Sequence, residues 1–166
     1  WLLIDNKTAQ NNLKKILVSN DIDPNRMIFA GRLPHSEHII RLGLADLFLD
    51  TFPCNAHTTA SDALRSSLPI ITIKGDSFAS RVASSLLSSV GLEELITKSG
   101  KEYEELAVKI AENKNFYKEI KDKLKKNIID MPLFNSKLFT KKLETAYSEV
   151  YKNYNENIKP ETIQIN

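Results

Sequence analysis

The feature that most constrains the fold of this chain is an alternation of short apolar runs with helical patterns, which stops near Gly100. Apolar runs at residues 27–29, 47–49 and 70–73 have the length and composition of buried strands. Apolar residues at helical spacing occupy residues 8–19, 36–44, 58–67 and 77–90. This alternation predicts an α/β fold, in which a parallel sheet is flanked by helices on both faces.

Beyond Gly100 the sequence predicts helices alone, at residues 101–113, 115–130 and 136–156, with Pro132 separating the last two. A chain of 166 residues is long enough to bury a core of its own. We therefore expect one domain over residues 1–156 and a loose polar tail over residues 157–166. The apolar run at residues 1–4 has the pattern of a strand without a preceding turn, so we expect the chain to be a fragment of a larger protein.

Composition excludes several classes of protein. No window approaches the roughly 20 apolar residues that span a bilayer, and the first residues lack the features of a secretion signal. We expect a soluble, cytoplasmic protein with no membrane partner. The net charge of +2 is too small to indicate nucleic-acid binding. The single cysteine, Cys54, cannot form an internal disulfide.

Residues suited to recognition are confined to the first hundred positions. Every arginine, histidine and glycine lies between Arg26 and Gly100, whereas the basic residues that follow are all lysine. Ligands of open parallel sheets bind outside the carboxyl ends of the strands. The loops at residues 30–35, 51–57 and 74–77 are therefore the candidate site.

The loop DTFPCNAHTT at residues 50–59 ends a predicted strand and opens a helix. Thr58 and Thr59 begin that helix, where their hydroxyls are placed to cap free amides and the positive end of the helix dipole attracts anions. Asp62 lies one turn further along the same face, within reach of a ribose. The alternative is that the threonines only cap the helix and that Asp62 is a favourable first-turn acid.

A helix end alone contributes about 0.3–2 kcal/mol towards an anion. Micromolar binding needs about 8 kcal/mol, so other groups must hold the ligand. His35, His38 and Arg41 recur at three-residue steps and share one face of a helix. There a histidine ring can stack on a base, and main-chain groups near Leu33 can contact the edge of the base.

Two other chemistries fit the same residues. His35 and His38 with Cys54 and His57 form H-x2-H and C-x2-H pairs, which are plausible zinc-ligand spacings. Cys54 and His57 also suit a thiol nucleophile and its base. Neither a G-x-G-x-x-G motif nor a Walker lysine motif is present, which disfavours the familiar kinds of dinucleotide and ATP binding.

Three runs of the sequence resemble one family. They are LDTFPCNAHTTASDALRSSLPIITIKGDSFASRVASSLLSSVG, EYEELAVKIAEN and PLFNSKLFTKKLETAY. Together they resemble the carboxyl-terminal catalytic portion of the O-linked N-acetylglucosamine transferases, with the family's CN-x-HTT, ASRVA and PLFN motifs. The resemblance covers nearly the whole chain in the same order.

The resemblance implies the second Rossmann-like lobe of a metal-independent, inverting GT-B glycosyltransferase that needs no cofactor. It places HTT on the donor diphosphate, the following acid on the ribose, and the segment before and within residues 36–44 near uracil and ribose. The implied UDP-binding residues are Leu33, Pro34, His35, His38, Arg41, His57, Thr58, Thr59 and Asp62. Well-known members have lysine where His35 stands, so the ribose contact at that position departs from the family pattern.

The implied function is the UDP-sugar-binding lobe of an enzyme that transfers N-acetylglucosamine from UDP to Ser or Thr of proteins. The family's partners are a first GT-B lobe, tetratricopeptide repeats and a protein acceptor. We expect this fragment alone to be inactive, with no assigned catalytic residue and His57 as the one candidate base. The alternatives are a nucleotide-sugar-binding module, a relative that uses GDP-fucose or UDP-glucose, and a zinc-dependent enzyme.

Overall fold

The structure is a computed structural model and describes residues 6–165. The chain divides into two compact units, Trp1–Arg41 and Leu42–Asn166, which are described separately. The strand expected at residues 1–4 lies outside the described residues.

The first unit contains two of the predicted helices. Helix α1 spans Lys7–Val18, and the side chain of its N-cap, Asn6, accepts a hydrogen bond of 3.0 Å from the Ala9 amide. A short 3-10 turn follows at Pro24–Arg26. Helix α2 spans His35–Leu42 and so begins and ends slightly earlier than the apolar spacing predicts. Both helices are confirmed.

Residues 27–29 do not form the buried strand that their composition predicts. Phe29 makes a single β-bridge, and Ile28 is 63% exposed. A strand requires a ladder of consecutive pairs with a neighbour. A short apolar run indicates a tendency to be covered but does not specify the neighbour, and this is why the prediction was wrong here.

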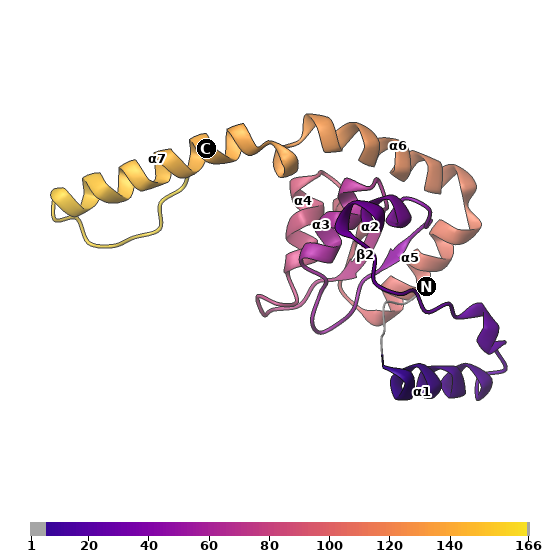
Figure 1. The fold of residues 1–166 in the computed structure, drawn as a ribbon. Helices are drawn as coiled ribbons and strands as arrows, with labels where there is room; N and C mark the ends of the chain where they lie inside the picture. The colour runs from indigo at the N-terminus through magenta and orange to yellow at the C-terminus, as the bar shows by residue number, and fades with distance from the viewer. Residues whose placement is uncertain (1–5, 166) are drawn as a thin grey trace. The chain divides into compact units, whose positions relative to one another are not determined.

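The second unit is built on a three-stranded parallel sheet with the order β1-β2-β3, of which Figure 1 labels β2. Strand β1 is Phe48–Leu49, β2 is Ile70–Ile73 and β3 is Ile96–Thr97. Phe48 pairs with Ile70, and Thr72 pairs with Ile96. The sequence predicted β1 and β2 but missed β3. A two-residue strand is too short to leave a pattern, and β3 directly follows the 3-10 turn Glu93–Leu95.

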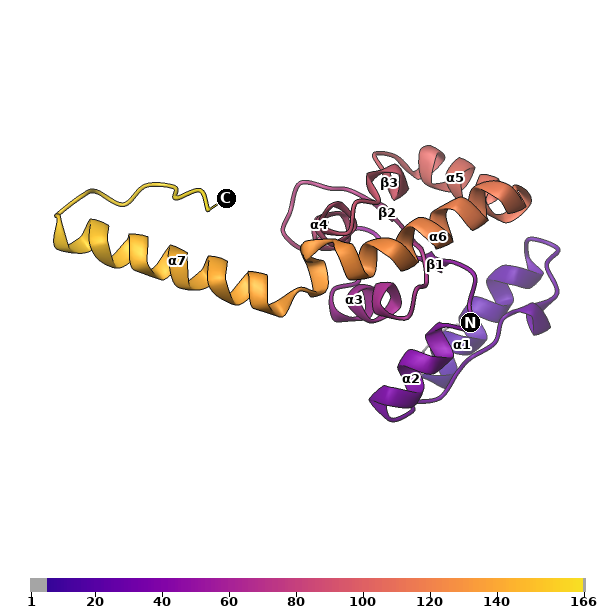
Figure 2. The ribbon, with the colours of Figure 1, turned by 90° about the horizontal axis from the view of Figure 1, so that it is seen from above.

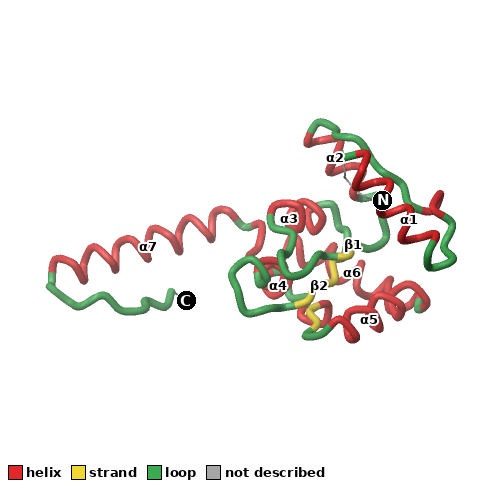
Figure 3. The backbone as a smooth tube through the Cα atoms, turned by 90° about the horizontal axis from the view of Figure 1, so that it is seen from below, coloured by secondary structure: helices red, strands yellow, loops and turns green. Residues whose placement is uncertain are grey.

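Helices cover both faces of this sheet, as the alternation predicted. Helices α3 (Thr58–Arg65) and α4 (Val82–Ser89) lie on one face, and α5 (Gly100–Glu112) lies on the other (Figures 2 and 3). Helix α4 starts later than predicted, because residues 77–81 form turns instead. The Ser77 amide donates to the Ser80 hydroxyl at 3.1 Å, and such local side-chain bonds compete with helix formation.

Large aliphatic side chains from the sheet and its helices form the core. Leu64 of α3, Ile71 of β2 and Leu87 of α4 have no exposed surface. Helix α6, Lys114–Asp130, completes the core with Ile120 and Leu124. A chain of this length was expected to bury its own core, and the second unit does so.

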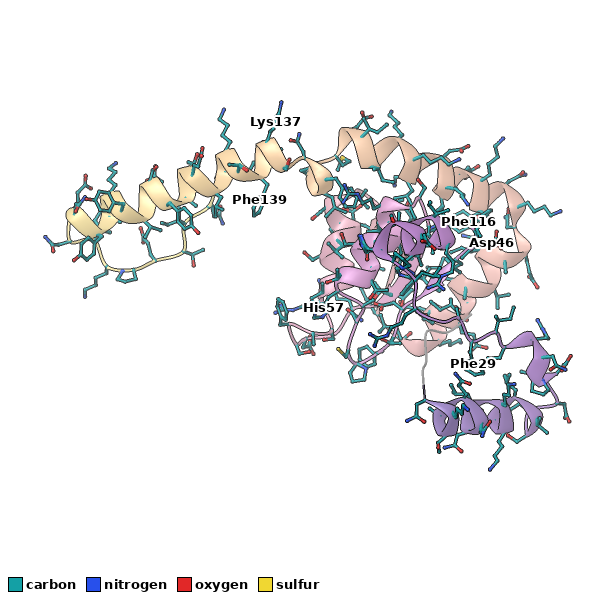
Figure 4. The ribbon with its side chains drawn as sticks, in the orientation of Figure 1. Phe29, Asp46, His57, Phe116, Lys137 and Phe139 are labelled. Carbon is teal, nitrogen blue, oxygen red and sulfur yellow. The ribbon has the colours of Figure 1, made fainter. Side chains whose placement is uncertain are left out.

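The C-terminal part of the chain is helical, as predicted. After the 3-10 turn Pro132–Phe134, helix α7 spans Ser136–Asn155 and contains no buried residue. Phe139, on this helix, is 65% exposed (Figure 4). Residues 158–165 contain neither helix nor strand. Over residues 6–165, no helix combines the length and the apolar character that crossing a membrane would need.

Candidate functional site at the carboxyl ends of β1 and β2

Asp50, which directly follows β1, organises the loop that the sequence analysis selected. This residue is 7% exposed, and its carboxylate accepts three hydrogen bonds. The Thr72 hydroxyl donates to Oδ2 at 2.6 Å, while the amides of Ala56 and Thr51 donate to Oδ1 at 2.6 Å and 2.9 Å. The Tyr103 hydroxyl on α5 donates to the Asp50 carbonyl oxygen at 2.9 Å. One buried residue thereby links β1, β2, α5 and the loop.

The loop itself, residues 51–57, is closed by short-range bonds. The Thr51 hydroxyl donates to the Cys54 carbonyl oxygen at 2.6 Å, and the peptide bond between Phe52 and Pro53 is cis. Asn55 is buried, and its side-chain amide donates to the Thr51 carbonyl oxygen at 3.0 Å. The turn that Pro53 and Asn55 predicted is therefore present.

A second loop, residues 74–81, lies against the first. The Asn55 amide donates to the Ala79 carbonyl oxygen at 2.9 Å. Gly75 permits this close approach, because a Cβ there would lie 2.7 Å from the Ser80 Cβ and 3.2 Å from the Phe52 ring. Two of the three candidate loops are thus adjacent, as expected for the carboxyl ends of neighbouring parallel strands.

Helix α3 begins at Thr58, as predicted, but its threonines do not cap it. They occupy the first two helical positions, and both side chains are exposed. The N-cap residue is His57, whose imidazole makes no capping hydrogen bond. The amides of Thr58, Thr59 and Ala60 precede the first intrahelical bond, from the Ser61 amide to the His57 carbonyl oxygen at 3.1 Å. This start of α3 can therefore offer amides to an anion.

His57 packs beside this helix start. Its ring lies edge-on to Phe78 at 5.8 Å between centroids, and Figure 4 shows it on the loop that precedes α3. His57 Nε2 is buried and has no hydrogen-bond partner among the described residues. Asp62 lies one turn into α3 and is partly buried. An unpartnered ring nitrogen at an open helix start indicates a polar site whose hydrogen bonds are not all made by the described residues.

The electrostatics of this region centre on Asp50. Burial raises the pKa of its carboxyl group, and the hydrogen bonds from Thr72, Ala56 and Thr51, with the charge of His57, oppose that rise. Burial and the nearby Asp50 charge together raise the pKa of Tyr103 to about 12. The Tyr103 phenol is therefore a hydrogen-bond donor throughout the neutral range.

The remaining predicted site residues belong to the first unit. The Arg41 guanidinium donates to the Gly31 carbonyl oxygen at 2.8 Å and to His38 Nδ1 at 3.0 Å. Arginine has no acceptor atom, so His38 Nδ1 must accept and the ring proton lies on Nε2. The shared helix face predicted for His38 and Arg41 is therefore present. Leu33 and Pro34 are exposed in the preceding loop, and His35 is the exposed first residue of α2.

Sequence reasoning missed the buried polar residues beneath the loop. Asp50 was noted as the start of the loop but not as the residue that organises it, and Thr72 and Tyr103 were counted as parts of a strand and a helix. The available signal was the LDT tripeptide, in which a carboxylate directly follows an apolar run. That signal suggests a strand end, but Thr72, which donates to the carboxylate, and Tyr103, which donates to the Asp50 carbonyl oxygen, are 22 and 53 residues away.

The two alternative chemistries gain no geometric support. Among residues 6–165, no group of three or more His, Cys, Asp or Glu side chains is placed to hold a metal ion. The exposed Cys54 thiol donates to the Asn55 carbonyl oxygen at 3.8 Å, whereas the His57 ring packs on Phe78.

Comparison with known proteins gives consistent matches. Residues 1–143 match the family described as glycosyl transferase family 41. A Caenorhabditis elegans protein named UDP-N-acetylglucosamine–peptide N-acetylglucosaminyltransferase is 32% identical over 93% of this chain. An Arabidopsis thaliana protein named as probable UDP-N-acetylglucosamine–peptide N-acetylglucosaminyltransferase SEC is 36% identical over 91% of it. The chain spans only 13% and 16% of these two relatives.

A solved structure has a similar fold. It is a mutant of the Thermobaculum terrenum O-GlcNAc transferase, with a TM-score of 0.81 and 24% sequence identity. The match covers 89% of this chain and 28% of that chain. The fold predicted from strand–helix alternation and from the family resemblance is confirmed.

Proposed function

Because this chain belongs to glycosyl transferase family 41, we propose that it is the donor-binding lobe of a protein O-glycosyltransferase and binds UDP-N-acetylglucosamine. The observation that carries the proposal is the open start of α3, with exposed Thr58 and Thr59 beside the unpartnered Nε2 of His57. The names of the similar proteins from Caenorhabditis elegans and Arabidopsis thaliana specify this donor and a peptide acceptor.

The start of α3 takes the donor diphosphate in this proposal. Its free amides and the two threonine hydroxyls donate to the phosphate oxygens, and the helix dipole adds attraction. Asp62, one turn further, accepts from the ribose. These donors stabilise the charge that develops on the departing diphosphate, so the residues of this chain need no metal or other cofactor for that role.

The nucleoside is assigned to the first unit. The bond from Arg41 orients the His38 ring and leaves its Nε2–H as a donor. In this orientation the ring is assigned to stacking over uracil. Leu33, Pro34 and His35 precede or open α2 and complete the uracil and ribose contacts. His57 is assigned to binding rather than to general base catalysis, because its Nε2 is buried at the diphosphate end of the site.

The whole protein transfers N-acetylglucosamine to Ser or Thr of acceptor proteins with inversion, in the cytoplasm, according to this proposal. Since the chain spans 13–16% of its two relatives, other segments supply the remaining machinery. These segments are the first GT-B lobe and, for acceptor binding, tetratricopeptide repeats. This chain alone should bind donor without turnover, and neither nucleic acid nor membrane is a partner.

The test is calorimetric titration of the full-length protein with UDP and GDP, each with and without EDTA, followed by transfer of labelled sugar to protein acceptors. Selective UDP binding that EDTA leaves unchanged, together with sugar transfer, is the expected result. Preference for GDP, loss of binding in EDTA, or absence of transfer would overturn the corresponding part of the proposal.

A matched pair of variants tests the residues. Replacing Thr59 with valine removes one hydroxyl at the start of α3 and should weaken UDP binding about tenfold or more, as for a lost bond to a charged group. Thr145→Val on α7 removes an exposed hydroxyl that bonds to the Lys141 carbonyl oxygen within the same helix, and it should leave UDP affinity unchanged. Equal affinities in the two variants would exclude the start of α3 as the phosphate site.

A further inference from the structure

Buried polar side chains of the described chain are concentrated beneath the loop of residues 51–57. Those with almost no exposed surface include Asp50, Asn55, Thr72, Ser80 and Thr97. Three of them are connected: the Thr97 hydroxyl donates to the Thr72 carbonyl oxygen at 2.9 Å, and the Thr72 hydroxyl donates to Asp50 Oδ2. A hydrogen-bonded layer therefore joins the carboxyl ends of all three strands to the loop.

Asp50 holds this loop at both ends. One carboxylate oxygen, Oδ1, accepts from the first amide of the loop at Thr51 and from the amide of Ala56, directly before His57. The other oxygen is held by Thr72 on the neighbouring strand, and Tyr103 holds the Asp50 carbonyl oxygen. The position at which α3 starts is thus set by the side chain of one buried residue, Asp50.

We propose that Asp50 is a positioning residue that holds the start of α3 ready for the donor diphosphate. The inference rests on the proposed function and adds to it a residue outside the predicted binding set. Amides that are already fixed in direction need no rearrangement when an anion binds, and this is why they bind the anion strongly. Without the carboxylate, the buried Thr72 hydroxyl and the part-buried amides of Thr51 and Ala56 lose their acceptor, and the loop must move to satisfy them.

The three donors to Asp50 require acceptor oxygens and do not require a negative charge. Its donors are a neutral hydroxyl and two neutral amides, and burial opposes ionisation. Its oxygens point to two loop ends and one strand, which a small apolar residue would leave unsatisfied. An asparagine can reproduce this arrangement: its oxygen accepts from both amides and its NH2 donates to the Thr72 hydroxyl, with that hydroxyl rotated.

The experiment measures affinity for UDP and for uridine by calorimetry in the full-length protein and in four variants. Uridine lacks the diphosphate, so the ratio of the two affinities reports the phosphate site. A general loss of folding lowers both affinities together. Asp50→Ala should lower UDP affinity about tenfold or more with uridine affinity changed less than about twofold, and Asp50→Asn should stay within about threefold of wild type for both.

A second pair keeps the test decisive if Asp50→Ala does not fold. Thr72→Val removes the hydroxyl on Asp50 Oδ2 and should lower UDP affinity about threefold to tenfold without affecting uridine. Thr97→Val is the control: its hydroxyl is equally buried and lies on the next strand, but it bonds to the Thr72 carbonyl oxygen and not to Asp50. Both affinities of this variant should match wild type.

The outcomes separate the two proposals. If wild type binds no UDP, the proposed function fails. If wild type binds UDP but Asp50→Ala keeps its UDP affinity, or loses UDP and uridine in parallel, the positioning role is overturned. It is overturned equally if Asp50→Asn behaves as Asp50→Ala does, or if Thr72→Val and Thr97→Val are indistinguishable.

Discussion

Gly91 tests how far one backbone position contributes to stability, because its conformation and its neighbours disfavour a side chain. It follows α4 with φ of 68°, in the left-handed region, and the Leu92 amide donates back to the Leu87 carbonyl oxygen at 2.9 Å. A Cβ on Gly91 would lie 3.0 Å from Asn127 Nδ2 and 3.3 Å from Met131 Cε. Asn127 cannot move freely, since it donates to the Val90 carbonyl oxygen at 2.8 Å.

Gly91→Ala should therefore lower the free energy of unfolding by about 1.5–2.5 kcal/mol. The left-handed conformation costs a residue with a Cβ about 1–2 kcal/mol. Disturbing the bond from Asn127 to Val90 costs about 1 kcal/mol more. The reduced freedom of the unfolded chain returns only about 0.5 kcal/mol. For a chain of this length the melting temperature should fall by roughly 3–10 °C.

Gly100→Ala is the matched control. Gly100 is the first residue of α5, and a Cβ there would have no atom within 4 Å. Alanine should leave stability unchanged or raise it by about 0.5–1 kcal/mol. Thermal and urea unfolding, followed by circular dichroism at the helical band, measures both variants. If the two stabilities agree within about 0.5 kcal/mol, the reasoning from backbone conformation is refuted.

Three further predictions concern the core and the two units. In urea titrations, Leu124→Ala should lower the free energy of unfolding by about 2–5 kcal/mol, because Leu124 is buried in the core. Lys125→Ala, at the exposed neighbouring position, should change it by less than about 0.5 kcal/mol. Equal effects would contradict the core assignment. Tyr103→Phe should cost about 1 kcal/mol near neutral pH by removing the bond to the Asp50 carbonyl oxygen. Folding raises the pKa of Tyr103 from 10.0 to about 12. The difference in unfolding free energy between wild type and Tyr103→Phe should therefore be complete below pH 10 and shrink as pH rises through 12. A difference that stays constant over this range would refute this prediction. Arg41→Lys should weaken uridine binding several-fold, because a lysine cannot bond to both the Gly31 carbonyl oxygen and His38 Nδ1 as a guanidinium does. An unchanged affinity for uridine in calorimetry would contradict the role proposed for Arg41.

Elements that carry a long periodic pattern were predictable. Helices α5 and α6 lie within a residue or so of their expected bounds, because many side chains contribute to each pattern. Strand β3 was missed, and residues 27–29 were wrongly predicted as a strand. Both segments contain only two or three residues. Whether such a short segment forms a strand depends on pairing with a neighbouring strand rather than on its own composition.

The candidate site divides in the same way. The loop at residues 51–57 and the helix start at Thr58 followed from turn residues and hydroxyls that are adjacent in sequence. The cap itself was misread, since His57 and not a threonine holds that position. Asp50 was overlooked as the organiser because Thr72 and Tyr103 reach it only in the folded chain.

The amino-acid order alone determined that strands alternate with helices, that the chain ends in helices, and which family it belongs to. These properties are local or additive along the chain, so periodicity and motif order express them directly. Only the tertiary structure decided which side chain holds the loop in place and which polar groups remain without partners. Such contacts join residues tens of positions apart, and the burial that gives them their energy exists only after the sheet and its helices have assembled.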